Sequence, residues 1–132
     1  MQELTLAVVG IDFPNPDRSR SNRRYELLLC VPGEAVSLVP EPKNPHDPHA
    51  VAVFSIRGVQ LGYLTAERAP WIGARLRAGE EVAAVFQGMG DTAAYVRVRF
   101  GGGVPTLPVG REASKPMDED FYPDPEGSEW GA

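Results

Sequence analysis

The sequence predicts a mainly β domain, an antiparallel barrel or sandwich with one or two short helices, followed by an irregular tail. Its 132 residues suffice for one domain plus a tail, and with 42% hydrophobic and 23% charged residues the composition is that of an ordinary globular protein. About seven short apolar or alternating runs are separated by Gly, Pro and Asn turns. These runs mostly follow one another without helical segments that would carry parallel crossovers, which favours antiparallel pairing.

The N-terminal part is expected to contain three strands. Residues 3–13 are apolar and β-branched and predict a strand, and the Pro, Asn, Asp and Ser residues that follow predict a loop. Residues 23–31 (RRYELLLCV) are expected to form the second strand, with Cys30 buried in it. A Pro-Gly turn then leads into a short third strand over residues 35–42, which its prolines end.

A hairpin and a helix are expected next. Residues 50–56 and 59–65 are apolar runs on either side of an Arg-Gly pair, which is typical of a β-hairpin. Thr65 is expected to cap a helix within residues 66–80. Apolar residues recur there at helical spacing, although a proline and a glycine weaken the pattern: Ala69, Ile72 and Leu76, with Pro70 and Gly73.

Residues 81–89 and 93–100 are expected to form the last two strands. In the second of these, Tyr95, Arg97 and Arg99 alternate with apolar residues. Such an alternation predicts one face toward a core and one toward solvent.

The charge is unevenly distributed along the chain. The net charge is −5, and residues 101–132 carry seven acidic and two basic side chains, so the first hundred residues carry eleven of each and are neutral. A local basic cluster, RSRSNRR, lies at residues 18–24. We therefore expect a domain over residues 1–101 and an acidic, Gly/Pro-rich flexible tail over residues 102–132.

Membrane insertion and export are not expected. No apolar run approaches the ~20 residues that a bilayer-spanning helix needs. The N-terminus MQELTLAVVG has no basic region of the kind that begins a signal peptide. The single cysteine excludes a disulfide framework, so we expect a cytoplasmic protein.

The stretch PKNPHDPH at residues 42–49 concentrates polar side chains between prolines. His46, Asp47 and His49 are candidate metal ligands, but the proline between the histidines prevents a helical spacing and no further Cys or His pair follows. No nucleophile motif is present either, so we expect no metal, no other cofactor and no enzymatic activity. Asn44 and Asp47 are also typical of a purely structural turn, and this alternative remains open.

Three motifs resemble the HIRAN domain family, which occurs in eukaryotic DNA-repair translocases and as small bacterial proteins. A Val-x-Gly sequence ends the first strand at residues 8–10, a Pro-x-Asn-Pro-x-Asp-x-x-Ala-Val sequence covers residues 42–51, and Gly-Tyr-Leu follows at residues 62–64. The resemblance extends over about residues 5–90. It implies an OB-like antiparallel barrel that binds single-stranded DNA at its 3′ end, as a non-catalytic module associated with DNA repair or processing.

The resemblance also implies a set of site residues. Asn44 and Asp47 would hydrogen-bond the terminal nucleotide, His46 would stack on a base, and Phe13 and Tyr63 would face the ligand. Phosphate contacts are expected from nearby cations, namely Arg20, Arg23, Arg24 and Arg68.

The sequence departs from the family pattern at two cation positions. Asp12 stands where the DNA-binding members have an arginine, and Thr65 and Ala66 stand where a lysine is expected. The partners that the resemblance implies are single-stranded DNA and a DNA-repair protein, whereas these two departures favour an alternative. The alternative is a HIRAN-fold module that binds a protein or a small ligand and has lost DNA binding.

Overall fold

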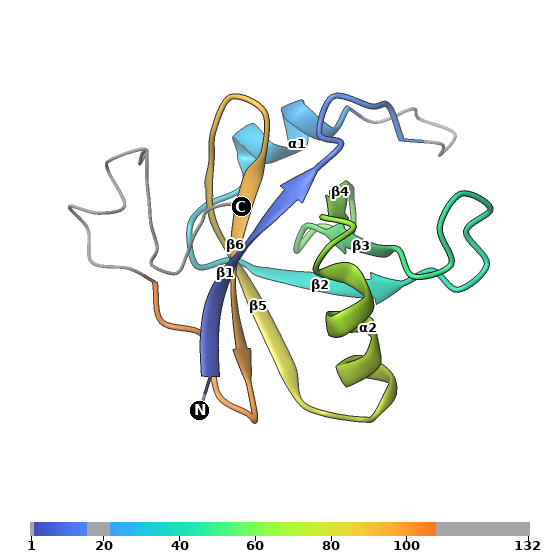
Figure 1. Cartoon of the computed structure of the whole chain (residues 1–132). Helices are drawn as coiled ribbons and strands as arrows, with labels where there is room; N and C mark the ends of the chain where they lie inside the picture. The colour runs from blue at the N-terminus through green and yellow to red at the C-terminus, as the bar shows by residue number, and fades with distance from the viewer. Residues whose placement is uncertain (1, 16–21, 108–132) are drawn as a thin grey trace.

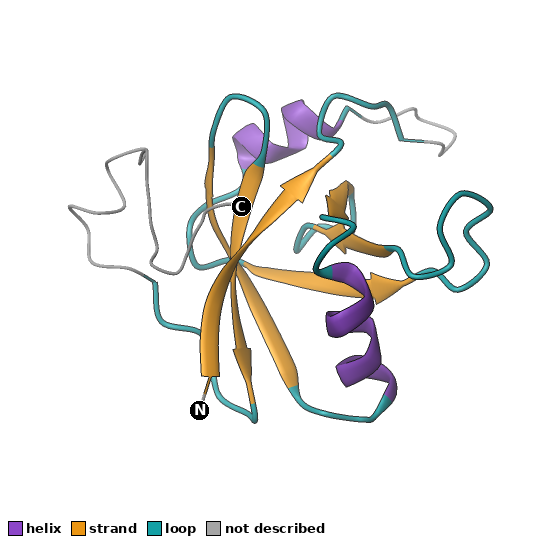
Figure 2. Cartoon of the chain, viewed as in Figure 1, coloured by secondary structure: helices purple, strands orange, loops and turns teal. Residues whose placement is uncertain are grey.

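Six antiparallel strands close into a barrel in the order β1-β4-β3-β2-β5-β6, accompanied by two short helices (Figure 1). The structure is a computed structural model that describes residues 2–15 and 22–107. The prediction of a mainly β antiparallel barrel with short helices is confirmed (Figure 2). The elements are β1 (Gln2–Val9), α1 (Arg23–Leu29), β2 (Ala35–Pro40), β3 (Val51–Phe54), β4 (Gln60–Leu64), α2 (Ala69–Arg77), β5 (Val82–Met89) and β6 (Ala94–Phe100).

One apolar core fills the barrel and reaches both helices. β6 shows the predicted alternation, because Val96 and Val98 are fully buried while the polar residues between them are partly exposed. Leu27 of α1 and Ile72 of α2 belong to the same buried cluster as the strands. In Figure 1, α1 lies at the top of the barrel and α2 at its lower right, so each helix covers a different part of the core.

Residues 23–31 begin with a helix, and the predicted second strand was wrong. The side chain of Asn22 accepts a backbone amide of the first turn at 3.0 Å, and Glu26 lies in that turn, where the helix dipole favours a carboxylate. Leu27 is the only buried leucine of the three in α1, so the run lacks the period-two burial of a strand. Cys30 is the partly buried C-cap residue of α1, and the barrel has six strands instead of about seven.

The helix α2 begins later than predicted. The N-cap position is Arg68, not Thr65, and no side chain caps the helix. The carbonyl of Thr65 instead accepts the backbone amides of Arg68 (3.1 Å) and Ala69 (2.9 Å), which forms a turn ahead of the helix. Pro70 lies in the first turn, where its missing amide costs nothing. The predicted apolar spacing is confirmed, since Ala69 and Ile72 are buried.

After β6 the chain returns over the outside of the barrel. Residues 101–103 are three glycines with φ values of 87°, 100° and 87°, a backbone conformation that residues with a side chain rarely adopt. Arg99 donates to a carbonyl of this turn at 2.7 Å, and the amide of Thr106 donates to Glu3 at 3.1 Å. The rest of the predicted tail, from residue 108 onward, lies outside the described residues.

Gly62 occupies the closest approach of β4 to β1. A Cβ atom at this position would lie 2.3 Å from the carbonyl oxygen of Val9 and 3.0 Å from the side chain of Val8. We expect Gly62→Ala to lower the free energy of unfolding by about 2–4 kcal/mol, because the two strands must separate. Chemical denaturation measures this. Gly88→Ala, in β5 where a Cβ would meet nothing within 4 Å, is the matched control, and equal losses for both variants would contradict the assignment.

Glu3 makes stability depend on pH. Burial raises the pKa of Glu3, but hydrogen bonds from Arg99 and the Thr106 amide, together with the charge of Arg97, outweigh it and hold the pKa below its ordinary value of 4.5. A carboxyl whose pKa falls on folding stabilises the protein above its unfolded-state pKa, and that contribution is lost as the pH falls. We expect Glu3→Gln to lower the free energy of unfolding at neutral pH by about 1–3 kcal/mol.

Denaturation of wild type and Glu3→Gln over a pH series tests this. The difference between the two should shrink as the pH drops through 4.5 and below. Glu67→Gln is the control, because Glu67 is exposed and forms no ion pair within the described residues. A difference between wild type and Glu3→Gln that stayed constant with pH would show that the carboxylate charge is not what stabilises this contact.

Candidate functional site

The Pro-rich segment between β2 and β3 is a turn held by its own polar side chains. Oδ1 of Asn44 accepts the backbone amides of His46 (2.8 Å) and Asp47 (3.0 Å). Oδ1 of Asp47 accepts the amide of His49 at 2.9 Å. The structural role considered for these residues is therefore present, and it fixes the shape of the turn. Oδ2 of Asp47 makes no hydrogen bond within the described residues.

A hydrogen-bonded network ties this turn to the barrel. Oε1 of Glu41 accepts both from Nδ2 of Asn44 (3.0 Å) and from the hydroxyl of Tyr63 on β4 (2.9 Å). The guanidinium of Arg23, the first residue of α1, lies 5.7 Å from the centre of the Tyr63 ring. The turn, β4 and the start of α1 therefore form one connected surface.

Arg23 is buried, and its guanidinium donates hydrogen bonds to other groups of the protein. The residue is 5% exposed, its Nε donates to Oδ1 of Asn15 at 2.6 Å, and its Nη1 donates to the Gly10 carbonyl at 2.7 Å. Asn15 in turn donates to the carbonyl of Gln60 at 3.0 Å. Burial lowers the pKa of Arg23, although neighbouring groups partly oppose this and an arginine stays charged. Arg23 thus connects the end of β1 with the start of β4.

Phe13 and Arg24 lie on the exposed edge of the same region. Phe13 is 67% exposed, and its ring lies 3.6 Å from the point that a Cβ of Gly10 would occupy. Arg24 forms an ion pair with Asp12 and also donates to the backbone carbonyl of Asp91. The hydrogen bond from Arg24 is the main reason why the pKa of Asp12 is lowered. A cation from α1 therefore stands beside Asp12, where the family pattern has an arginine.

The structure connects most of the predicted site residues and places one of them, Arg68, apart. Contacts, chain adjacency or the shared partner Glu41 join the connected ones, which are Phe13, Arg23, Arg24, Asn44, His46, Asp47 and Tyr63. Arg68 is exposed at the start of α2, with its guanidinium 5.9 Å from the Trp71 ring, and its side chain forms no hydrogen bond or ion pair with the turn. Arg20 lies outside the described residues.

Two residues of the network were missed by the sequence analysis. Glu41 belongs to a run that predicted a strand ended by prolines, and nothing in the sequence indicates that Tyr63 would reach it. Asn15 was assigned to a loop, yet it is only 4% exposed. One signal was available for Asn15, because its Asn-Pro sequence repeats the Asn-Pro sequence of the candidate turn.

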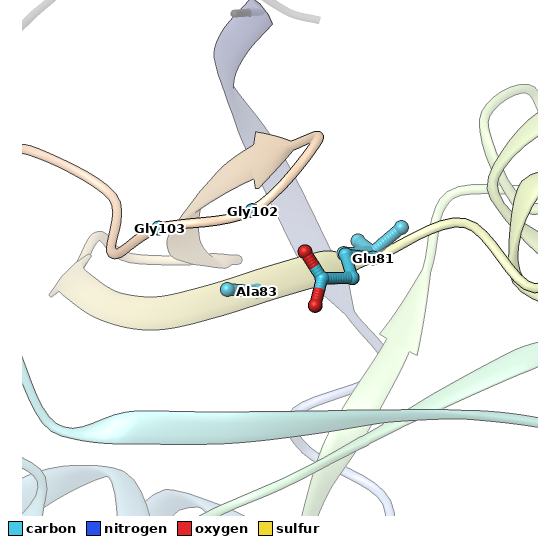
Figure 3. Close-up of a pocket in the computed structure, with 5 residues that line it drawn as sticks. Glu81, Ala83, Gly102 and Gly103 are labelled. Carbon is cyan, nitrogen blue, oxygen red and sulfur yellow. The ribbon is translucent and has the colours of Figure 1, made fainter.

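An open pocket on β5 offers little ligand chemistry. It is lined by Glu81, Val82, Ala83, Gly102 and Gly103 (Figure 3). The carboxylate of Glu81 reaches across it, and a Cβ on Gly102 would lie 2.7 Å from that carboxylate. One acidic side chain without convergent polar partners does not resemble a binding site.

Residues 2–15 and 22–107 contain neither a cluster of metal ligands nor a helix that could span a membrane. No three His, Cys, Asp or Glu side chains of this part come together as a metal site. No helix in the same part is long and apolar enough to cross a membrane.

The closed barrel and the motif-bearing turn define a small antiparallel β-barrel module. The chain belongs to the HIRAN domain family, whose model matches residues 20–98, more than half of the sequence. No similar sequence was found among curated proteins.

Three solved structures share the fold. The crystal structure of the HIRAN domain of human HLTF is 22% identical, with a TM-score of 0.58 over 74% of each chain. An NMR structure of the HLTF HIRAN domain in its DNA-bound conformation is 24% identical, with a TM-score of 0.52 over 74% of this chain and 73% of that one. A protein from Lactobacillus plantarum is 17% identical, with a TM-score of 0.62 over 76% of this chain and all of the other.

The two neighbouring arginines of α1 should respond differently to mutation. Arg23→Ala leaves Asn15 and the Gly10 carbonyl without their buried donor, so we expect it to lower the free energy of unfolding by about 2–4 kcal/mol. Arg24→Ala removes an exposed ion pair and should change stability little. Thermal and chemical denaturation of both variants provide the comparison. A larger loss for Arg24→Ala would be incompatible with the buried role of Arg23.

Proposed function

We propose that this protein is a non-catalytic nucleic-acid-binding module that holds the 3′ end of single-stranded DNA. It acts in DNA repair or processing in the cytoplasm, together with a repair protein. The observation that carries the proposal is the preset turn, in which one carboxylate oxygen of Asp47 has no hydrogen-bond partner among residues 2–15 and 22–107. The proposal draws support from the family, one member of which has a structure in a DNA-bound conformation.

The turn suits a terminal hydroxyl better than a phosphate. Oδ2 of Asp47 accepts hydrogen bonds, and a 3′-hydroxyl donates one. A 3′-phosphate would instead bring additional negative charge close to the carboxylates of Asp47 and Glu41. Asn44 and Glu41 fix the turn before a ligand binds. Little conformational entropy of the turn is therefore lost on binding.

Aromatic rings on the same surface suit bases. His46 and Phe13 are exposed, and Phe13 projects a ring that is 67% exposed beside the network. Stacking on such rings is worth about 1–3 kcal/mol per base and tolerates any sequence. Tyr63 is tied by its hydroxyl to Glu41, so it forms a fixed wall of the site.

The cations divide into phosphate contacts and a positioning residue. Arg24 stands beside Asp12 and supplies the positive charge that the first-strand motif lacks. Arg68 is exposed at the start of α2 and supplies a second one. Arg23 is buried and positions Tyr63 in place of contacting phosphate. A phosphate contact by Arg20 stays a prediction.

A protein- or small-ligand-binding module is the second candidate. It is favoured by the carboxylates of Asp12 and Glu41 within the connected surface, which oppose a polyanion. Under this candidate the turn recognises a donor group on a protein or a small molecule, and single-stranded DNA does not bind.

Asp47→Asn tests the hydroxyl contact while keeping the turn. The asparagine retains an oxygen for the His49 amide but removes the charged acceptor. We expect the affinity for an oligonucleotide with a free 3′-hydroxyl to fall by about 1–3 kcal/mol with an unchanged melting temperature. Fluorescence anisotropy at low and at physiological salt measures it. Glu81→Gln, which removes a carboxylate on β5, is the charge-matched control.

Wild-type protein should also prefer the 3′-hydroxyl over the 3′-phosphate of the same oligonucleotide. Equal affinity for both ends would exclude end recognition. Absence of binding to either oligonucleotide at low salt would favour the second candidate.

A further inference from the structure

Most cations of the described residues are engaged in hydrogen bonds or ion pairs with other groups of the protein. Arg23 is buried against a carbonyl and an amide oxygen. Ion pairs with carboxylates engage Arg24, Arg57, Arg75, Arg97 and Arg99. Within residues 2–15 and 22–107, the cations that form no ion pair are Lys43, Arg68 and Arg77.

The outer face of β1 and β6 therefore offers no route for an anionic strand. Its two arginines, Arg97 and Arg99, both reach the carboxylate of Glu3, at 3.4 and 2.6 Å. Arg99 is further occupied by the returning chain, to which it donates at 2.7 Å. An anionic ligand that enters here would have to replace contacts that stabilise the fold.

Two of these three cations, Lys43 and Arg77, belong to the turn and to the helix packed beside β3. Lys43 is part of the turn and exposed. Arg77 is exposed in the last turn of α2, and its Nη1 lies 3.2 Å from the point that a Cβ of Gly73 would occupy. That point is 3.7 Å from the side chain of Val51, the residue that begins β3 directly after the turn. The Arg77 guanidinium thus lies near Val51, where α2 packs on the start of β3.

The Arg77 guanidinium lies beside Gly73, a residue that destabilises the helix. Gly73 lies in the middle of α2, where a glycine costs about 1 kcal/mol relative to alanine. Gly73 is buried, and a Cβ on it would meet both the Arg77 guanidinium and the Val51 side chain. The absent side chain leaves room for the Arg77 guanidinium, which one more carbon atom at Gly73 would crowd at 3.2 Å.

We propose that Lys43 and Arg77 form a phosphodiester site between the turn and α2. This inference rests on the proposed function: the turn holds the 3′ end, and the strand leaves along α2 with its backbone phosphates against these two cations. Lysine supplies a compact charge and arginine a planar donor fork, and both recognise phosphate oxygens without reading the base. The site therefore adds affinity and direction to binding without adding sequence preference.

The salt dependence of binding by the full chain tests the site. The probe is oligothymidylate of about ten nucleotides with a free 3′-hydroxyl, titrated by anisotropy over a series of salt concentrations. Lys43→Ala/Arg77→Ala should reduce the slope of log affinity against log salt by about 1.4, or about 0.7 for each single-strand phosphate contact. Lys43→Arg/Arg77→Lys keeps both charges and should keep the slope.

The control Val31→Glu/Ile56→Glu changes the net charge by the same amount at exposed positions beyond the C-terminal end of α1 and in the β3–β4 turn. A slope loss confined to the alanine pair supports the site. If the alanine pair keeps the wild-type slope or matches the control, the site is wrong, while preference of wild type for the 3′-hydroxyl leaves the proposed function standing. If wild type binds no oligonucleotide at low salt, the proposed function itself fails.

Discussion

The barrel closes where β1 runs beside β4, and the candidate site is built on this closure. The register pairs Val8 with Leu64 and Val9 with Tyr63, so β1 pairs with β4 over far fewer residues than with β6. Gly62 makes it achievable, because its missing side chain admits the Val9 carbonyl. The Gly-Tyr-Leu motif therefore has two physical duties, since its glycine closes the barrel and its tyrosine faces the turn.

Beyond the end of β1 a charged side chain continues the closure. Arg23 binds the Gly10 carbonyl and Asn15, and Asn15 binds the carbonyl of Gln60 at the start of β4. Removing a guanidinium from water is costly, so the arrangement persists only because its donors meet carbonyl and amide oxygens and the Tyr63 ring lies nearby. The same contacts hold Tyr63, and with it Glu41 and the turn, in place before any ligand arrives.

The polar groups of the turn serve structure and recognition together. The side-chain oxygen of Asn44 accepts two backbone amides, and its nitrogen donates to Glu41. Asn44 therefore shapes the turn and has little hydrogen-bonding capacity available for a ligand. One oxygen of Asp47 accepts the His49 amide, and the other has no hydrogen-bond partner in the part of the chain that the structure describes. The two arginines beside the site are also engaged within the protein. Arg24 forms an ion pair with Asp12 at the exposed edge, while Arg23 is buried. Neighbouring arginines in the sequence thus have opposite environments.

Patterns local to one element were sufficient for much of the fold. The alternation in β6, the hairpin of β3 and β4 and the Pro-rich turn are predictable because burial on a strand repeats every two residues and prolines end strands. The run of α1 was misassigned, because a short leucine-rich run has no decisive period and its cap residue Asn22 fits a loop equally well. The structure has six strands and two helices, because packing in the barrel determines which side chains of each run are buried.

The sequence by itself determined the family motifs, the barrel class and the polar content of the turn. Only the tertiary structure decided that Arg23 is buried, that Arg24 stands beside Asp12, and that Glu41 joins Asn44 to Tyr63. The reason is physical: residue patterns record how one element meets the core, whereas these contacts join segments whose distance depends on strand register and barrel closure. A side chain's partner, and therefore whether its charge is available to a ligand, is set by that closure.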